Sequence, residues 1–187
     1  MNAIERSIFK MAVAEACGRT IDTPFGPFSI IACEKGLMYA SWGTLHPFEA
    51  LLDKLKAGER TRAFADQAEA ELHAYFYRGE VQFQVPLVYH GTPFQEAVWA
   101  GLRSIPYGQT WSYRELALQI GNPLAVRAVG QANRANRIAV VIPCHRVIGA
   151  NGALVGYAGS ETDLKASLLR HEQSVVACRQ TSDLVRE

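Results

Sequence analysis

The sequence has almost no excess of charge of either sign, because 19 lysine and arginine residues nearly balance 18 aspartate and glutamate residues and leave a formal net charge of +1. It therefore lacks the strongly basic composition of many nucleic-acid-binding proteins, and any face that binds nucleic acid must be local. Long apolar runs are also missing: no stretch approaches the roughly 20 residues that span a bilayer, and residues 1–15 lack the apolar core of a signal peptide. We expect a cytoplasmic protein that does not enter a membrane.

Cysteine is scarce as well. The four cysteines, Cys17, Cys33, Cys144 and Cys178, are widely spaced and form no CxxC pair. They are too few for a disulfide framework and too scattered for a zinc knuckle, so a reducing compartment is expected. The sequence contains no internal repeat or low-complexity tract, and 49% of its 187 residues are hydrophobic, which predicts a folded chain of one large or two small domains.

The first half of the sequence has the pattern of a small α/β module. Apolar and β-prone residues fill 28–42 and are interrupted at Glu34-Lys35-Gly36, which predicts two strands joined by a turn. Residues 47–55 and 64–76 carry apolar residues at helical spacing and predict two helices. In the second of these helices, the residues expected to point inward are Leu72, Tyr75 and Phe76.

The second half begins with a helix-start signal. Thr92 can cap a helix that has Pro93 at its first position, and residues 94–105 continue it with apolar residues on one face. We place a domain boundary near residues 85–92. The expected domains are 1–88 and 89–175, followed by a tail at 176–187.

Two short helices joined by a tight turn are predicted next. Ser112 and Glu115 have the spacing of a capping box and start a helix that Gly121 ends. Asn122-Pro123 then caps and begins a second helix that runs to about Ala132. The pair is a candidate helix-turn-helix, although many such pairs are only packing units.

The remaining elements are a strand and a helix. The apolar run 138–142, which Pro143 ends, could be a buried strand. A last amphipathic helix is expected to start at Ser160 or Thr162 and to end near Glu172, leaving a loosely held tail.

Pro143-Cys144-His145-Arg146 directly follows the apolar run, so a thiol is held at the exit of rigid structure beside an imidazole and a guanidinium. A cysteine with a pKa of about 8.5 is only a few per cent thiolate at neutral pH, and a neighbouring base or positive charge raises that fraction. The segment therefore predicts a nucleophile. The alternative for an arbitrary Cys-His pair is a buried apolar cysteine beside a surface histidine.

This segment closely resembles the O6-alkylguanine-DNA alkyltransferase family. The residues that carry the resemblance are 142–148, Gly156-Tyr157, Lys165 and 168–172, and, upstream and in the same order, Phe94-Gln95, Val98-Trp99, 105–108, Ser112-Tyr113 and 125–136. The match covers 85–172 strongly and the first half more loosely. The resemblance implies an α/β fold with a ribonuclease H-like first module and a mostly helical, winged-helix-like second domain that contains the helix-turn-helix.

The resemblance also implies a role for each residue near the thiol. Cys144 would accept an alkyl group from O6-alkylguanine, His145 would act as the base through a water, and Glu172 would orient His145. Asn136 would hold the turn at Cys144. Because no residue would cleave the S-alkylcysteine, the expected reaction is a single turnover, and it needs no cofactor.

The family acts on a base that is flipped out of duplex DNA. Arg127 would fill the gap, and the small residues around it would let its helix approach the minor groove. The residues expected to contact DNA or the flipped base are Tyr113, Ala125, Arg127, Ala128, Gly130, Arg134, Val147, Tyr157, Ala158 and Gly159. Without the resemblance, 125–132 fits a core helix and Tyr113 fits a helix surface.

The sequence departs from the family at two places. The stretch 157–165 lacks the common second glycine and has one residue more, so the alkyl-size preference does not carry over. Some eukaryotic members bind a structural zinc, and Cys17, Cys33 and His90 fall near the corresponding places, but Met38 stands where a histidine would be. Three ligands do not close a tetrahedral structural site, so no metal is expected.

We therefore expect a methylated-DNA–protein-cysteine S-methyltransferase that acts as a monomer on double-stranded DNA containing O6-alkylguanine, and on O4-alkylthymine as well. In a bacterium it would associate with the nucleoid. Two alternatives are a module that binds alkylguanine without repairing it, as alkyltransferase-like relatives do, and a cysteine hydrolase. Cys144 disfavours the first, since those relatives lack the acceptor. The direct adjacency of His145 to Cys144 disfavours the second.

Overall fold

A computed structural model describes residues 15–79, 82–154 and 162–184 of the chain. The chain divides into two compact units: unit 1 is Met1–His90 with Arg137–Val141, and unit 2 is Gly91–Asn136 with Ile142–Glu187. A short piece of the second half of the sequence therefore belongs to unit 1. None of the helices in the described part of the chain is long and apolar enough to cross a membrane.

Unit 1 is built on a three-stranded antiparallel sheet in the order β1-β2-β3. The strands are β1 (Cys17–Thr23), β2 (Gly26–Cys33) and β3 (Gly36–Trp42). The predicted turn after Cys33 is confirmed, because β2 and β3 pair directly across it. β1 was not predicted: only Cys17 and Ile21 of this edge strand are buried, so its apolar pattern is weak.

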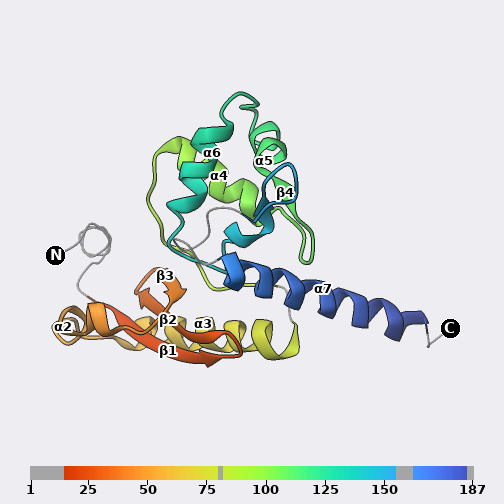
Figure 1. Ribbon diagram of the computed structural model, residues 1–187. Helices are drawn as coiled ribbons and strands as arrows, with labels where there is room; N and C mark the ends of the chain where they lie inside the picture. Colours follow the sequence, from red (N-terminus) through yellow and green to blue (C-terminus); the bar gives the residue numbers. More distant parts are fainter. Residues whose placement is uncertain (1–14, 80–81, 155–161, 185–187) are drawn as a thin grey trace. The chain divides into compact units, whose positions relative to one another are not determined.

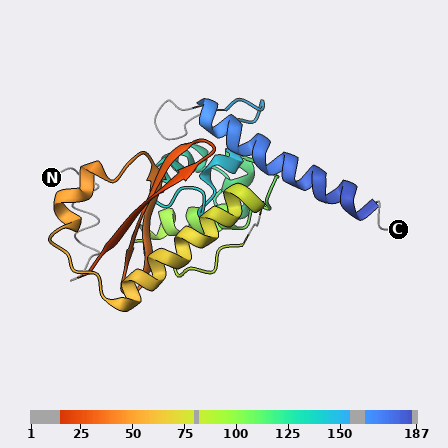
Figure 2. The same ribbon diagram turned by 90° about the horizontal axis from the view of Figure 1, so that it is seen from below.

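One face of the sheet is covered by α3 (Glu59–Arg78), which packs against all three strands (Figure 2). The prediction that Leu72, Tyr75 and Phe76 point inward is confirmed, since all three are buried. The Phe76 ring meets Phe28 edge-to-face, with ring centroids 5.8 Å apart. The predicted helix at 47–55 is shorter than expected and consists of η1 (His46–Phe48) and α2 (Glu49–Leu52).

The outer edge of β3 is paired with two short segments of unit 1. The Leu37 N–H donates to the Pro86 carbonyl at 2.8 Å, and the Ala40 N–H donates to the Arg137 carbonyl at 2.9 Å. The Ala139 N–H returns a bond to the Ala40 carbonyl at 2.8 Å. These bonds satisfy main-chain groups that an edge strand would otherwise expose.

The strand predicted at 138–142 is wrong. The segment forms only an isolated bridge between Ile138 and Ala40, although four of its residues are buried. Val140 has a φ of +70°, a conformation that turns the chain and is rare for a β-branched residue. The apolar run is therefore a buried turn, which periodicity does not distinguish from a strand.

Unit 2 is mostly helical (Figure 1). Its helices α4 (Pro93–Arg103), α5 (Tyr113–Gln119) and α6 (Val126–Arg134) pack against one another. A two-residue strand, β4 (Trp111–Ser112), pairs in parallel with β5 (Val147–Ile148). The other elements are η2 (Cys144–Arg146) and α7 (Thr162–Leu184).

The predicted helix starts at Thr92 and Ser112 are confirmed, and each is a reciprocal capping box. The Thr92 hydroxyl accepts from the Gln95 N–H at 3.2 Å, while the Gln95 side chain accepts from the Thr92 N–H at 2.9 Å. Ser112 and Glu115 make the same pair of bonds, at 3.1 and 2.6 Å. Gly121, with a φ of +73°, follows the end of α5 as predicted.

Two predicted helix boundaries are wrong. α6 starts at Val126 rather than at Asn122-Pro123, because the Ala125 N–H bonds to the Asn122 carbonyl at 2.9 Å and closes a turn ahead of the helix. α7 starts at Thr162, one of the two predicted positions, but continues to Leu184 instead of ending near Glu172.

Candidate active site

Two tight turns place Cys144 at the start of η2. The first is centred on Val140, where the Val141 N–H donates to the Ala139 carbonyl at 2.9 Å. The second is centred on Pro143, with φ −81° and ψ 64°, and the Cys144 N–H donates to the Ile142 carbonyl at 2.8 Å. These are the dihedral angles of an inverse γ-turn, and the proline ring holds φ near the required value.

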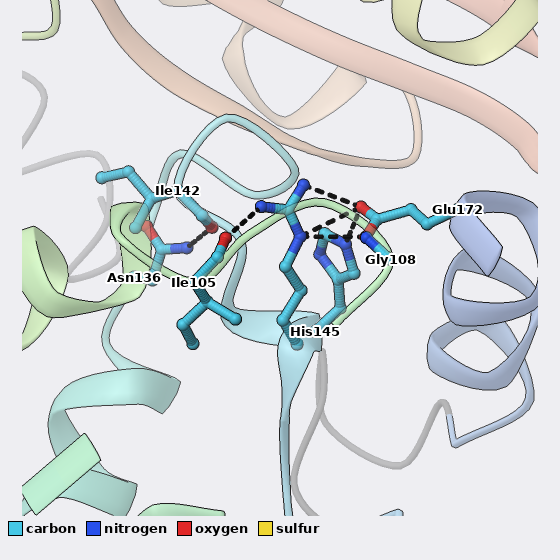
Figure 3. Close-up of polar contacts among 7 residues, drawn as sticks. Ile105, Gly108, Asn136, Ile142, His145 and Glu172 are labelled. Carbon is cyan, nitrogen blue, oxygen red and sulfur yellow. Dashed lines mark hydrogen bonds and ion pairs between the residues drawn. The ribbon is translucent and has the colours of Figure 1, made fainter. Parts of the chain in front are cut away.

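Asn136 ties this turn to the thiol. Its side-chain N–H donates to the Ile142 carbonyl at 2.8 Å (Figure 3) and to the Cys144 sulfur at 3.1 Å. The buried Asn133 side chain donates to the Cys144 carbonyl at 3.5 Å. Cys144 itself is only 7% exposed.

The environment of Cys144 favours the protonated thiol. Burial raises the pKa of Cys144, while the hydrogen bond from Asn136 and the charge of Lys165 act in the opposite direction. Burial prevails, so the resting protein holds a neutral thiol at neutral pH. A nucleophilic reaction at this sulfur therefore needs a base.

Such a base lies next to Cys144 in the chain. The Nε2 of His145 donates to the Glu172 carboxylate at 2.8 Å, and both side chains are fully buried. Figure 3 shows the His145 ring and the Gly108 main chain meeting at this carboxylate, with the Gly108 N–H at 3.0 Å. Burial acts to raise the pKa of Glu172, but the bonds and charges of His145 and Arg146 hold it well below its ordinary value.

Arg146 clamps the same carboxylate. Its Nε donates to one Glu172 oxygen at 2.9 Å and its Nη2 to the other at 2.9 Å, while its Nη1 donates to the Ile105 carbonyl at 2.8 Å. The guanidinium carbon lies 5.4 Å from the centroid of the Tyr107 ring. A bidentate pair of this kind fixes the carboxylate in orientation as well as in charge.

The ionised state of Glu172 determines the tautomer of His145. Because Nε2 donates to a carboxylate, Nε2 carries the hydrogen and Nδ1 is the basic nitrogen of the neutral ring. Burial lowers the pKa of His145, and the hydrogen bond to Glu172 only partly offsets this. The ring is therefore neutral at neutral pH and able to accept a proton.

Lys165 is a second buried cation in the site. Its Nζ donates to the Val147 carbonyl, and the residue has no exposed surface. Burial lowers the pKa of Lys165 to about 8, and the Cys144 charge acts against that shift. From the sequence, Arg146 was expected only as a positive charge beside the thiol, and Lys165 had no predicted role.

The predicted base-contacting and DNA-contacting residues fall into two groups. Tyr113 is half-buried on α5, and burial first and the Cys144 charge second raise its pKa. Val147 is buried in β5. On α6, Arg127, Ala128 and Arg134 are exposed, while Ala125 just before it and Gly130 within it are half-buried. The predicted contacts Tyr157, Ala158 and Gly159 lie outside the described residues.

The two cysteines considered as zinc ligands lie in separate packing clusters of unit 1. Cys17 packs with Ala32 and Ala65, whereas Cys33 packs with Ile31 and Met38. In the part of the chain that the structure describes, no group of three or more His, Cys, Asp or Glu side chains is arranged to hold a metal ion.

Two family models match the chain, and together they define its class. The DNA-binding domain of 6-O-methylguanine DNA methyltransferase matches residues 93–174, and the ribonuclease-like domain of the same protein matches residues 18–89. The predicted order of an α/β module and a helical DNA-binding domain is therefore confirmed.

Individual relatives give the family. A constitutive methylated-DNA–protein-cysteine methyltransferase of Bacillus subtilis is 51% identical over 57% of this chain and 65% of its own length. The methylated-DNA–protein-cysteine methyltransferase of Methanosarcina acetivorans is 44% identical over 82% of this chain and 96% of its own. The crystal structure of Mycobacterium tuberculosis OGT in complex with DNA has a TM-score of 0.68 and 41% identity, covering 84% of this chain and 92% of that one. This chain belongs to the methylated-DNA–protein-cysteine methyltransferase family.

Proposed function

We propose that this protein repairs O6-alkylguanine in duplex DNA by transferring the alkyl group to the sulfur of Cys144. The observation that carries the proposal is the burial of Cys144, His145 and Glu172, in which the carboxylate orients the imidazole of the residue that directly follows Cys144 in the chain. A nucleophile, a base and a group that orients the base are the parts that activate a cysteine. The names of the relatives give a protein cysteine as the methyl acceptor.

The reaction is a displacement at the alkyl carbon. His145 takes the Cys144 proton through a water, and Asn136 steadies the developing thiolate with the N–H that already reaches the sulfur. The sulfur lone pair attacks the carbon, an S–C bond forms, and the bond from that carbon to guanine O6 breaks. The electron pair leaves with O6, and guanine regains the proton that His145 removed. Thiol and alkyl ether thus become thioether and guanine, without a cofactor.

The product explains why each molecule reacts once. A thioether is neither acidic nor readily hydrolysed, so the Cys144 sulfur does not return to its thiol form by the chemistry of this site. The protein is consumed stoichiometrically. Its active-site residues accelerate a single alkyl transfer.

DNA binding is assigned to α6. Arg127, Gln131 and Arg134 are exposed at spacings of four and three residues, which places them near one another on the helix surface, and the helix has no acidic residue. Exposed Ala128 leaves room for close approach to a groove. A relative of similar fold was solved with DNA. We infer that α6 supplies the local basic face that the nearly neutral composition requires.

The alkylated base must leave the stack to reach Cys144. Flipping a nucleotide costs a few kcal/mol, and a side chain that enters the gap offsets part of that cost. We assign this role to Arg127, and we assign contact with the flipped base to Tyr113, Val147 and residues 157–159. O4-alkylthymine carries its alkyl group on an exocyclic oxygen as well, so we expect it to react.

We further infer that the protein acts as a monomer in the cytoplasm, near the nucleoid if the source is bacterial. A single chain supplies every residue of the proposed mechanism. All four cysteines carry thiols, which suits a reducing compartment.

Intact mass after incubation with a duplex containing one O6-methylguanine tests the proposal. We expect the protein to gain one methyl group, located on the peptide that contains Cys144, and Cys144→Ser to gain none while still binding the duplex. The other three cysteines are the internal control. A methyl group on Cys17, Cys33 or Cys178, or an unmodified protein, would refute the assignment.

A further inference from the structure

α7 continues beyond residue 174, where the match to the DNA-binding-domain family model ends. Up to that point, Lys165, Leu168, Leu169 and Glu172 form a buried stripe along the helix. Their spacings of three and four residues place them on one face. Val176 follows Glu172 by four residues and is half-buried, so the stripe extends by one further turn.

Val176 lies against the turn formed by residues 105–108. Gly108 has a φ of +76°, and the Gln109 N–H donates to the Pro106 carbonyl at 3.1 Å, which closes the turn. A Cβ added at Gly108 would come within 2.8 Å of the Val176 Cγ2 and 3.5 Å of the Glu172 carbonyl oxygen. The turn therefore packs directly on α7, and glycine is required there by both φ and space.

Arg179 is exposed, about one turn further along α7. It follows Val176 by three residues, and its charge acts on Tyr107 at the centre of the turn. Burial and the Glu172 charge raise the pKa of Tyr107 to about 12, against the opposing charges of Arg146 and Arg179. Val176 therefore packs against the 105–108 turn, whereas Arg179 acts on it through its charge.

Both ends of the 105–108 turn are hydrogen-bonded to Glu172 or to its partner Arg146. Its Gly108 N–H donates to Glu172 at 3.0 Å, and its Ile105 carbonyl accepts from Arg146 at 2.8 Å. The position of the turn therefore sets where Glu172 is held and where its Arg146 clamp is anchored.

We propose that Val176 is a positioning residue that braces the 105–108 turn and thereby fixes Glu172 against His145. The inference rests on the proposed function of Cys144 and adds the extension of α7 to it. Without the Val176 methyl groups, space opens beside Gly108 and the bond from its N–H to Glu172 lengthens. A displacement of about 1 Å in such a support can slow a reaction by about a hundredfold.

The pH dependence of Cys144 is a readout that a packing role alone would not move. Other titratable and charged groups surround His145, Glu172 and the Cys144 thiol. They are Arg146 from η2, Tyr107 from the turn, Tyr113 from α5, and Lys165 and Arg179 from α7. None of them is altered by a change at Val176. A shift of the profile would therefore report the geometry of Glu172 and His145.

The test compares valine variants of α7 in a Cys178→Ser background, because Cys178 is exposed and would react with thiol reagents. We expect Val176→Ala to slow methyl transfer from an O6-methylguanine duplex by about tenfold or more. We also expect it to move the midpoint for alkylation of Cys144 by a small thiol reagent to higher pH. Val176→Ile keeps both branches at Cβ, so it should retain the transfer rate and the alkylation midpoint of the unsubstituted protein.

Val175→Ala is the matched control, since it removes a half-buried valine from the adjacent position of the same helix. It should leave the midpoint in place. If Val176→Ala lowers the unfolding temperature but leaves rate and midpoint unchanged, or if Val175→Ala shifts the midpoint equally, the inference is overturned. Failure of the unsubstituted protein to accept the methyl group would instead overturn the proposed function.

Discussion

At the scale of single residues, the sharing of Glu172 explains how His145 remains a usable base. An imidazole that faces an unshared carboxylate in a buried site would hold its proton strongly. Here Arg146 also bonds to the same carboxylate, and its charge acts against that of Glu172 on the imidazole. Burial therefore prevails and lowers the pKa of His145. The ring keeps its orientation from Glu172 without being protonated by it.

We predict that His145→Ala shifts the alkylation of Cys144 by a small thiol reagent to higher pH. The thiol pKa is already raised by burial, and the substitution removes the adjacent base that draws off its proton. The measurement is the rate against pH, followed on the Cys144 peptide by mass spectrometry. His171→Ala, a half-buried histidine one residue before Glu172, is the control and should keep the original profile. An unchanged profile for His145→Ala would remove His145 from the mechanism.

The sequence predicted individual site residues only where a local motif carried them. Cys144 and His145 stand out because a thiol and an imidazole directly follow a proline at the end of an apolar run. Glu172 came from the resemblance to a family, since nothing local distinguishes it from other glutamates. The roles of Arg146 and Lys165 depend on burial between segments distant in sequence, which no local pattern encodes.

At the scale of elements, complete capping motifs predicted helix starts well, whereas a continuous apolar run did not identify the kind of element. The capping boxes at Thr92 and Ser112 were predictable because each is complete within four residues. The turn at 138–142 looked like a strand, since burial on all sides gives the same continuous apolar run. The extension of α7 was missed because only Val175 and Val176 continue its apolar face, among mostly polar neighbours.

For α6, we predict that Arg127→Ala slows repair of duplex DNA by about tenfold or more while leaving the reaction with free O6-benzylguanine nearly unchanged. The free base needs no flipping, so only the duplex reaction loses the few kcal/mol by which a filled gap offsets unstacking. Transfer rates at saturating duplex are the measurement. Arg134→Ala, on the same exposed face, should weaken binding in a salt-sensitive way that saturation rescues. Full rescue of Arg127→Ala by saturation would make Arg127 a phosphate contact.

At the scale of the whole molecule, the buried ionic groups link stability to pH. The pKa of Glu172 is below its ordinary 4.5 in the folded protein, so its contribution is present above pH 4.5 and is lost as the pH falls. The pKa of His145 is below 6.5, so the unfolded chain takes up that proton first as the solution is acidified. Both shifts therefore have the same sign, and both favour unfolding in acid.

We predict that the free energy of unfolding falls continuously from about pH 6.5 to about pH 4, as measured by denaturant titration. Glu172→Gln should lower stability near neutral pH by about 3–5 kcal/mol, because it leaves Arg146 buried without its counter-charge. Glu172→Gln should also make the free energy of unfolding depend less steeply on pH. A wild-type protein equally stable across this range would contradict the assignment of both shifts.

The membership of residues 137–141 in unit 1 has a consequence for biosynthesis. Ala40 is made early, but its partners Arg137 and Ala139 emerge much later, so the outer edge of β3 stays incomplete while most of the chain is being translated. The chain then has to join this edge and return to unit 2 immediately before Pro143 and Cys144. Closing so long a loop is the kind of contact that forms late in folding. We therefore expect Cys144 to be unreactive in a nascent or truncated chain, and to become reactive only when the complete chain has folded.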